Sequence, residues 1–180
     1  MKPQDTWVRH ECGTDRTTLE EVRLSMRTPV YGVLDNLRSA HNVGSIFRSA
    51  DGANAAGLHI CGYSPVPPHR HLAKTALGAV ESVSWSQHVV AEAAIAELRA
   101  QGVQILAMEK TDDSVSLWDF PLQFPLAIVM GNEADGLSEA TLALCDATVH
   151  LPMFGLKNSL NVSVAFGVAM YEILRRYQNS

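Results

Sequence analysis

The sequence predicts an α/β protein in which one parallel sheet is flanked by helices. From about residue 30 onward, strand-like runs alternate with runs of helical periodicity, which is the pattern of a parallel sheet. The apolar segments 103–109 and 126–131 continue without strict alternation, as strands covered on both faces do. The 180 residues contain no internal repeat and no long linker, so a single domain is expected.

The individual elements follow from periodicity and from the positions of glycine and proline. Strands are expected at 30–35, 57–63, within 83–90, and at 103–109, 126–131 and 147–151. Helices are expected at about 41–56, 71–77, 91–102, 138–144 and 160–178. Residues 1–28 are polar and are expected to form an N-terminal extension with one short helix, capped by Thr17 or Thr18 and closed by Pro29.

The composition excludes several classes of protein. No run approaches the roughly 18 apolar residues of a membrane span, and no apolar signal region is found at the N-terminus, so export is not expected. Cys12, Cys61 and Cys145 lie far apart without a C-x-x-C pair, which favours reduced thiols in a cytoplasmic protein over a disulfide or zinc framework. The net charge of −5 argues against strong non-specific binding of nucleic acid, although residues 1–75 carry more basic than acidic side chains.

The first segment that could carry functional chemistry is NLRSAHNVGSIFRSADGANAAG at 36–57. On helical spacing, one apolar stripe should pack on the sheet, and it comprises Val43, Ile46, Phe47, Ala50 and Ala53. Arg48 lies opposite this stripe, and Gly44, one turn earlier, is expected to leave clearance beside its guanidinium. The helix should begin at the carboxyl edge of the sheet, where α/β proteins bind ligands. Without the other segments, Arg48 is more simply explained as a solvated arginine on the surface of an amphipathic helix than as a functional residue.

The second segment, GNEADGL at 131–137, follows a buried strand. Gly131 permits close approach of a ligand to the backbone, and Glu133 should lie just beyond the strand end. A plain turn built from Asn, Asp and Gly explains the same residues. The glycine patterns of dinucleotide-binding and nucleoside-triphosphate-binding loops do not occur in the chain.

The third segment is LPMFGLKNSLNVSVAFGVAMYEILRR at 151–176. Its apolar, bent loop is suited to hold a flat heterocycle, and Ser159 and Asn161 are candidates to cap the last helix. That helix is apolar on two sides, which indicates cover on both. One stripe comprises Val162, Phe166, Ala169 and Ile173, and the other comprises Val164, Val168 and Tyr171. The second covering is expected to be a partner subunit.

These three blocks, in this order from about Val30 to Tyr177, resemble the SpoU family of RNA ribose methyltransferases within the SPOUT superfamily. The resemblance implies transfer of a methyl group from S-adenosylmethionine to a ribose 2′-hydroxyl of tRNA or rRNA. It further implies a methyltransferase domain at 29–180, a C-terminal trefoil knot in the α/β sheet, and a homodimer formed through the last helix. Ala134-Asp135 and Lys157-Asn158 depart from the residues frequent in the family, and neither removes a proposed functional side chain.

The resemblance also assigns roles residue by residue. Catalytic roles fall to Asn42, Arg48, Glu133, Ser159 and Asn161. The cofactor is expected against Met108, Gly131, Leu151, Met153, Ser159 and Leu160. For the RNA we expect contacts from Arg38, Arg48, Arg70 and Lys74, and from the basic residues of the extension (Arg9, Arg16, Arg23 and Arg27).

The role of Arg48 in the reaction stays open at this point. Either its site depresses its pKa so that it accepts the hydroxyl proton, or it stays cationic and positions a phosphate or oxyanion. The alternative function is a non-catalytic RNA-binding member of the same fold. No metal is expected, because His10-Glu11-Cys12 has no matching second half and because His69 and His71 flank Arg70 in a proline-rich loop.

Overall fold

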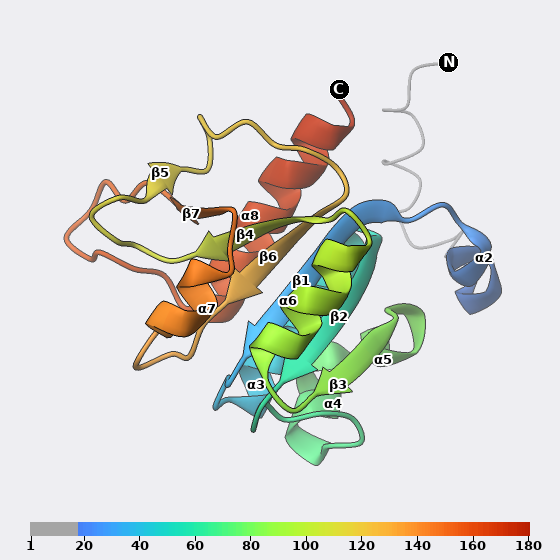
Figure 1. Ribbon diagram of the computed structural model, residues 1–180. Coiled ribbons are helices and arrows are strands. Elements are labelled where there is room, and N and C mark those ends of the chain that lie inside the picture. The colour runs from blue at the N-terminus through green and yellow to red at the C-terminus, as the bar shows by residue number, and fades with distance from the viewer. Residues whose placement is uncertain (1–17) are drawn as a thin grey trace.

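Seven parallel strands organise the part of the chain that the computed structural model describes, residues 18–180 (Figure 1). The strand order across the sheet is β3-β2-β1-β6-β4-β7-β5. The strands are β1 (Thr28–Asp35), β2 (Ala55–Cys61), β3 (Trp85–His88), β4 (Gln104–Met108), β5 (Val115–Ser116), β6 (Leu126–Met130) and β7 (Ala147–His150). The predicted parallel α/β sheet is therefore confirmed.

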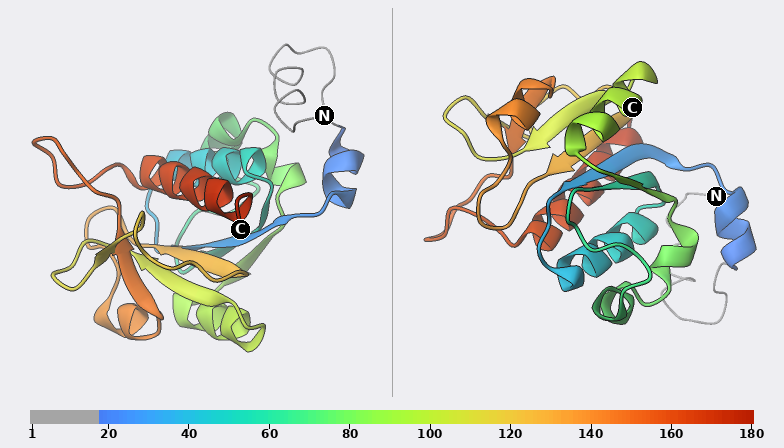
Figure 2. Two further views of the ribbon diagram at one scale, coloured as in Figure 1. Left: turned by 90° about the horizontal axis from the view of Figure 1, so that it is seen from above. Right: turned by 60° about the horizontal axis from the view of Figure 1, so that its bottom comes forward.

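Helices cover both faces of the sheet. They are α2 (Leu19–Leu24), α3 (Ala40–Gly52), α4 (Arg70–Ala76), α5 (Ala79–Ser82), α6 (Ala91–Ala100), α7 (Glu139–Ala143) and α8 (Val162–Tyr177). Helices α3 and α8 lie side by side on one face, with α4 against α3, whereas α6 and α7 lie on the other face (Figure 2). No described helix has the length and apolarity that crossing a membrane requires.

The core forms on both sides of the central strands. All five residues of β6 are buried, because β1 and β4 flank it and helices cover both of its faces. The stripe predicted for α3 is confirmed, since Val43, Ile46, Phe47 and Ala50 are all fully buried. On α8, Phe166, Ala169 and Ile173 are likewise buried against the sheet and α3.

Helix α3 ends four residues earlier than predicted. The backbone of Asn54 has a φ of 50°, a left-handed conformation that stops the helix. The Asn54 side chain is bound in turn, because it donates to the Met26 carbonyl and accepts from the Arg27 guanidinium. Strand β2 can therefore begin at Ala55, two residues before the predicted start. The short elements α5 and β5 were not predicted, since neither is long enough to show a periodicity.

Gly44 has a different role from the one predicted. A Cβ at this position would overlap the Thr75 hydroxyl and the Leu72 carbonyl, so the absence of a side chain allows α4 to pack directly on α3. Helix α4 occupies the space beside Gly44, so no clearance is left there for the Arg48 guanidinium. The expectation of clearance beside the guanidinium was therefore wrong.

The N-terminal helix is capped at its start as predicted, but it ends at Leu24 and not at Pro29, which lies in β1. Thr18 is the N-cap of α2, and Thr18 and Glu21 form a reciprocal capping box. The Arg23 guanidinium donates to the Glu81 carbonyl, which ties α2 to the domain. Residues 1–17, and with them Thr17, His10, Cys12, Arg9 and Arg16, lie outside the described residues.

Candidate functional site

A cavity of about 540 Å³ opens at the carboxyl ends of β4, β6 and β7, where parallel α/β sheets bind their ligands. The loops that follow these strands and the start of α8 supply its walls. The lining residues are Met108, Glu109, Lys110, Met130, Gly131, Asn132, Glu133, Ala134, Gly136, His150, Leu151, Met153, Asn158, Ser159, Leu160, Asn161, Val162 and Ala165. Apolar and polar groups contribute in similar measure, and the volume suits a ligand of nucleoside size.

All six residues expected to hold the cofactor lie in this wall, and they come from three separate loops. They are Met108, Gly131, Leu151, Met153, Ser159 and Leu160. Glu133 and Asn161 line the same cavity, and Asn42 is hydrogen-bonded to both of them. The structure therefore brings the second and third sequence blocks together. Asn42 joins both to the start of α3, which belongs to the first block.

The Glu133 carboxylate connects the β6 loop to the beginning of α3. Its Oε2 accepts from the backbone N–H of Arg38 at 2.8 Å, and its Oε1 accepts from the N–H of Ser39 at 3.1 Å. The side-chain amide of Asn42 donates to the same Oε1 at 2.8 Å. Backbone N–H groups at a helix start lack intrahelical acceptors, so a carboxylate is favourable here.

These hydrogen bonds keep Glu133 ionised. Partial burial favours the neutral acid and raises the pKa of Glu133. Donation from the Arg38 N–H, the Asn42 amide and the Ser39 N–H outweighs that effect and lowers the pKa below its ordinary value. With its oxygens engaged in this way, Glu133 holds the start of α3 and orients Asn42.

Asn161 has two functions in the structure. Its Oδ1 accepts from the backbone N–H groups of Ser163 and Val164, so Asn161 is the N-cap of α8 as predicted. Its Nδ2 donates to Oδ1 of Asn42 at 3.2 Å. Ser159, the other capping candidate, does not cap α8 and lies two residues earlier in the cavity wall. A chain of contacts thus runs from Asn161 through Asn42 to Glu133.

The packing within the turn after β6 accounts for its glycines, and no bound ligand is needed to explain them. A Cβ on Gly131 would lie 2.5 Å from the backbone carbon of Gly136, because residues 132 and 136 form a bridge across the turn. Asn132, which the sequence analysis left without a role, is buried and fixes this turn. Its amide donates to the Asn36 carbonyl and the Tyr63 hydroxyl, and its Oδ1 accepts from the Ala134 and Asp135 N–H groups.

Arg48 lies outside the cavity wall. It is exposed on the outer side of α3, and its guanidinium has no hydrogen bond or ion pair with any side chain or backbone group among residues 18–180. Among residues 18–180, it is therefore the one member of the predicted catalytic set that neither lines the cavity nor is hydrogen-bonded to a residue that does. Its place opposite the buried stripe of α3 is as predicted, and its role in the reaction stays a prediction.

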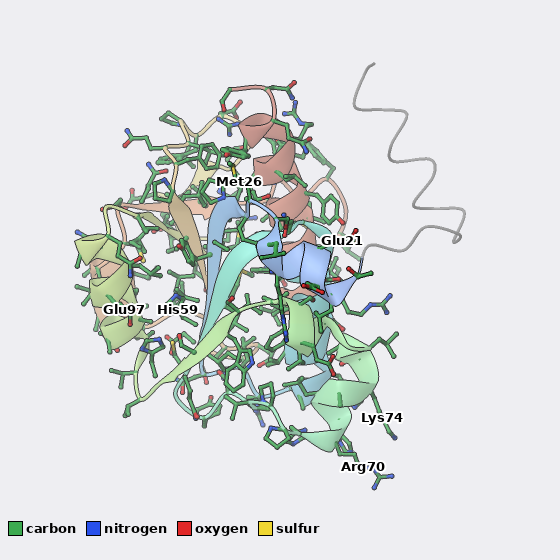
Figure 3. The ribbon with its side chains drawn as sticks, turned by 90° about the vertical axis from the view of Figure 1, so that its right-hand side faces the viewer. Glu21, Met26, His59, Arg70, Lys74 and Glu97 are labelled. Atoms are coloured by element: carbon green, nitrogen blue, oxygen red, sulfur yellow. The ribbon has the colours of Figure 1, made fainter. Side chains whose placement is uncertain are left out.

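Arg38, Arg70 and Lys74, which were predicted to contact RNA, also lie on the surface and not in the cavity, whereas Arg27 is half-buried and its guanidinium donates to Asn54 and to the Ser82 carbonyl. Arg38 is exposed at the start of α3, and its backbone binds Glu133. Arg70 and Lys74 project outward from α4 (Figure 3). The ring of His71 stacks on that of His41 at a centroid distance of 5.4 Å, which places the starts of α3 and α4 side by side.

A second, acidic cavity of about 300 Å³ lies beside the first and was not predicted. Asp35, at the end of β1, is buried in its wall, and Glu92 and Asp135 line it as well. Burial raises the pKa of Asp35, and the charge of Glu92 raises it further. Asn132 and Gly136 belong to both cavities, so the turn after β6 forms the partition between them.

Comparison with known proteins agrees with this geometry. The SpoU rRNA Methylase family matches residues 29–171. The tRNA (guanosine(18)-2′-O)-methyltransferase of Escherichia coli strain K12 is 36% identical over 159 residues, which are 87% of this chain and 68% of that protein. The 23S rRNA (guanosine-2′-O-)-methyltransferase RlmB of Vibrio parahaemolyticus is 34% identical, over 88% of this chain and 64% of that protein. The chain thus spans about two thirds of the length of these relatives.

Solved structures share the fold. The SpoU methyltransferase AviRb from Streptomyces viridochromogenes, in complex with AdoMet, superposes with a TM-score of 0.78 at 27% identity, over 88% of this chain and 64% of that one. The A. aeolicus TrmH/SpoU tRNA modifying enzyme superposes with a TM-score of 0.79 at 27% identity, over 89% and 83%. The family match, the two relatives and the common fold all cover the three blocks that meet at the cavity, and the chain accordingly belongs to the SpoU rRNA methylase family.

Proposed function

We propose that this protein transfers a methyl group from S-adenosylmethionine to a ribose 2′-hydroxyl of tRNA or rRNA. The observation that carries the proposal is the convergence of three loops on one cavity, with Asn161, Asn42 and Glu133 joined at its edge. Family membership supplies the reaction class, and the names of the relatives supply the two classes of RNA.

The cavity fits the cofactor by its chemistry as well as its size. Met108, Leu151 and Met153 offer apolar surface for a purine ring, and Asn158 and Ser159 offer polar groups for a ribose and an amino acid moiety. When bound, S-adenosylmethionine supplies an electrophilic methyl group on a sulfonium. The residues of the chain then have to orient the RNA hydroxyl, dispose of its proton and exclude water.

For Arg48 we favour the positioning role. Guanidinium groups stay protonated in proteins, and Arg48 is exposed on the outer side of α3. A cation that projects from α3 is suited to hold an RNA phosphate beside the cavity. Asn42, held by Glu133 and Asn161, would orient the substrate from the same helix.

The partner assembly belongs to the proposal too. We propose a homodimer through α8, because Val164, Val168 and Tyr171 remain 44–50% exposed on the side of α8 that faces away from the core. To test the dimer, Val168→Asp should halve the mass measured by sedimentation, while Val89→Asp, on an exposed loop, should leave it unchanged.

Three further expectations stay predictions. They are the domain boundary near residue 29, the cytoplasmic location expected of a protein acting on tRNA or rRNA, and the trefoil knot implied by the resemblance.

The test of the proposed function is transfer of labelled methyl from S-adenosylmethionine to total RNA, followed by nucleoside analysis. Wild-type protein should place label in a 2′-O-methyl nucleoside of the tRNA or rRNA fraction. Arg48→Ala should lower the label about 10²–10³-fold, whereas the matched variant Arg99→Ala, on α6 at the opposite face, should retain it. Cofactor binding without transfer to any RNA fraction would instead favour the non-catalytic RNA-binding protein.

A further inference from the structure

Three polar side chains meet at the edge of the sheet, away from the cofactor cavity. In the β2–β3 register, His59 lies opposite Ser86 and Cys61 lies opposite His88. Side chains at alternate positions of a strand share a face, so His59, Ser86 and His88 all point toward α6. Glu97 extends from α6 toward the same place, and Figure 3 shows it beside His59.

The heteroatoms form a small triangle. His59 Nδ1 lies 2.9 Å from His88 Nε2, and the Ser86 hydroxyl oxygen lies 3.2 Å from the first nitrogen and 2.9 Å from the second. A carboxylate oxygen of Glu97 lies within 4.8 Å of both ring nitrogens. His59 is only 7% exposed, so its ring depends on these neighbours for polar contacts.

Hydrogen bonds can occupy at most two of the three sides of this triangle. A ring nitrogen has a single position in the ring plane, which carries either a proton or a lone pair. The Ser86 hydroxyl can accept from one ring and donate to the other, which leaves the two nitrogens 2.9 Å apart with no hydrogen bond between them. A cation at the centre would accept both nitrogen lone pairs and an oxygen lone pair at the same time.

We propose that His59, His88 and Glu97 bind one first-row divalent cation, with Zn²⁺ the best fit and Ser86 or water completing the coordination. Nitrogen and oxygen ligands lie about 2.0–2.1 Å from Zn²⁺, so two ligands are about 2.9 Å apart at a right angle and about 3.3 Å apart in a tetrahedron. The distances between the two nitrogens and the serine oxygen match this range. Two imidazoles and a carboxylate form a donor set typical of zinc.

Burial favours the neutral form of His59. Burial lowers the pKa of His59, and the adjacent His88 lowers it further, against the opposing effect of the Glu97 carboxylate. A neutral imidazole is the form that ligates a metal ion. Glu97 is exposed on α6, where its side chain can change rotamer without disturbing the core.

The inferred ion is structural. His59, His88 and Glu97 line neither described cavity, and they come from β2, the edge strand β3 and α6. A cation there would fasten the four-residue edge strand to its neighbour and to the helix above it. The inference does not depend on the proposed methyl transfer.

The test is zinc binding by the full-length protein after removal of metal with a chelator. Isothermal titration with ZnCl₂ should give a site in wild type that His88→Gln and Glu97→Gln each weaken at least about tenfold, as loss of one ligand does. Both positions are partly or fully exposed, so these variants should fold, which circular dichroism checks. His71→Gln is the matched control, because it removes an exposed imidazole of the separate His41–His71 pair and should leave zinc binding unchanged.

A Co²⁺ titration provides the second measurement. Wild type should develop visible d–d absorption on binding Co²⁺, and His59→Gln should lose it. The proposal is overturned if wild type binds no zinc. It is equally overturned if His88→Gln and Glu97→Gln bind zinc as tightly as wild type, or if only His71→Gln loses the site.

Discussion

The cavity edge and the outer side of α3 differ in whether their polar side chains have hydrogen-bond partners within the chain. At the cavity edge, Asn161, Asn42 and Glu133 are joined by hydrogen bonds of 2.8 and 3.2 Å, and the start of α3 is fixed by the same carboxylate. On the outer side of the same helix, Arg48 has no partner among the described residues. The chain itself therefore fixes the cavity edge, whereas nothing in residues 18–180 fixes the Arg48 guanidinium.

The largest effect is expected at Arg48. Arg48→Lys keeps the charge but loses the planar fork, and we expect methyl transfer to fall at least about tenfold, with about 10²–10³-fold for Arg48→Ala. The dissociation constant for S-adenosylmethionine should stay within about twofold, because Arg48 does not line the cavity. Single-turnover transfer and equilibrium binding measure the two quantities. Near-wild-type transfer by Arg48→Lys would remove the need for a forked group.

Gly131 should be the most sensitive backbone position at the cavity. In Gly131→Ala the new Cβ meets the backbone of Gly136 and Leu137 at 2.5–2.7 Å, and we expect a loss of about 1–3 kcal/mol in the free energy of unfolding. Cofactor binding should weaken in parallel. Gly155→Ala is the control in the neighbouring loop, since nothing lies within 4 Å of its Cβ position. Urea unfolding that is equal for the two variants would contradict this account of the turn.

Asn161 allows its two functions to be separated. Asn161→Asp keeps the acceptor that caps α8 but loses the N–H that binds Asn42, so methyl transfer should fall while the stability changes little. Asn161→Ala loses both and should cost about 1 kcal/mol of stability, the usual cost of losing an N-cap. Urea unfolding and methyl transfer measured on both variants test the separation. Equal transfer rates for wild type and Asn161→Asp would show that the contact with Asn42 is dispensable.

The smallest effect concerns pH and Glu133. Because its folded pKa is lowered, Glu133 stabilises the protein above its unfolded pKa of about 4.3, and this contribution is lost as the pH falls through the lower folded value. Solvent screening limits it to about 1 kcal/mol or less. Glu133→Gln should therefore reduce stability at pH 7 and flatten the dependence below about pH 4.3. Glu139→Gln, which alters a carboxylate without a described hydrogen bond, should leave the slope of urea stability against pH unchanged.

Most of the fold was predictable because its strands and long helices carry strong patterns. The buried run of β6 and the apolar stripe of α3 depend on sequence-local periodicity, and both were located. The end of α3 was missed because it depends on Asn54 being held by Met26 and Arg27 from the preceding segment. Contacts between distant segments of this kind leave no local pattern.

The candidate site was predictable to a similar degree. Gly131, Glu133 and Asn161 stood out as small or polar residues at strand and helix ends, and all three lie at the cavity. Asn132 was overlooked between two of them, since its four partners are set by the fold. The pair His59 and His88 was invisible for the same reason, because 29 residues separate them and only the register of β2 and β3 brings them together.

The position of β6 between β1 and β4 has a consequence for how the chain folds. Strands β1 and β2 with α3 can form a unit by residue 61, but the second edge of β1 pairs only with residues 126–130. Until those residues join, an apolar strand edge is open to other chains. Pairings that close such long loops slow folding, so the rate of refolding should be set by the arrival of β6 and should fall in variants that weaken its pairing with β1.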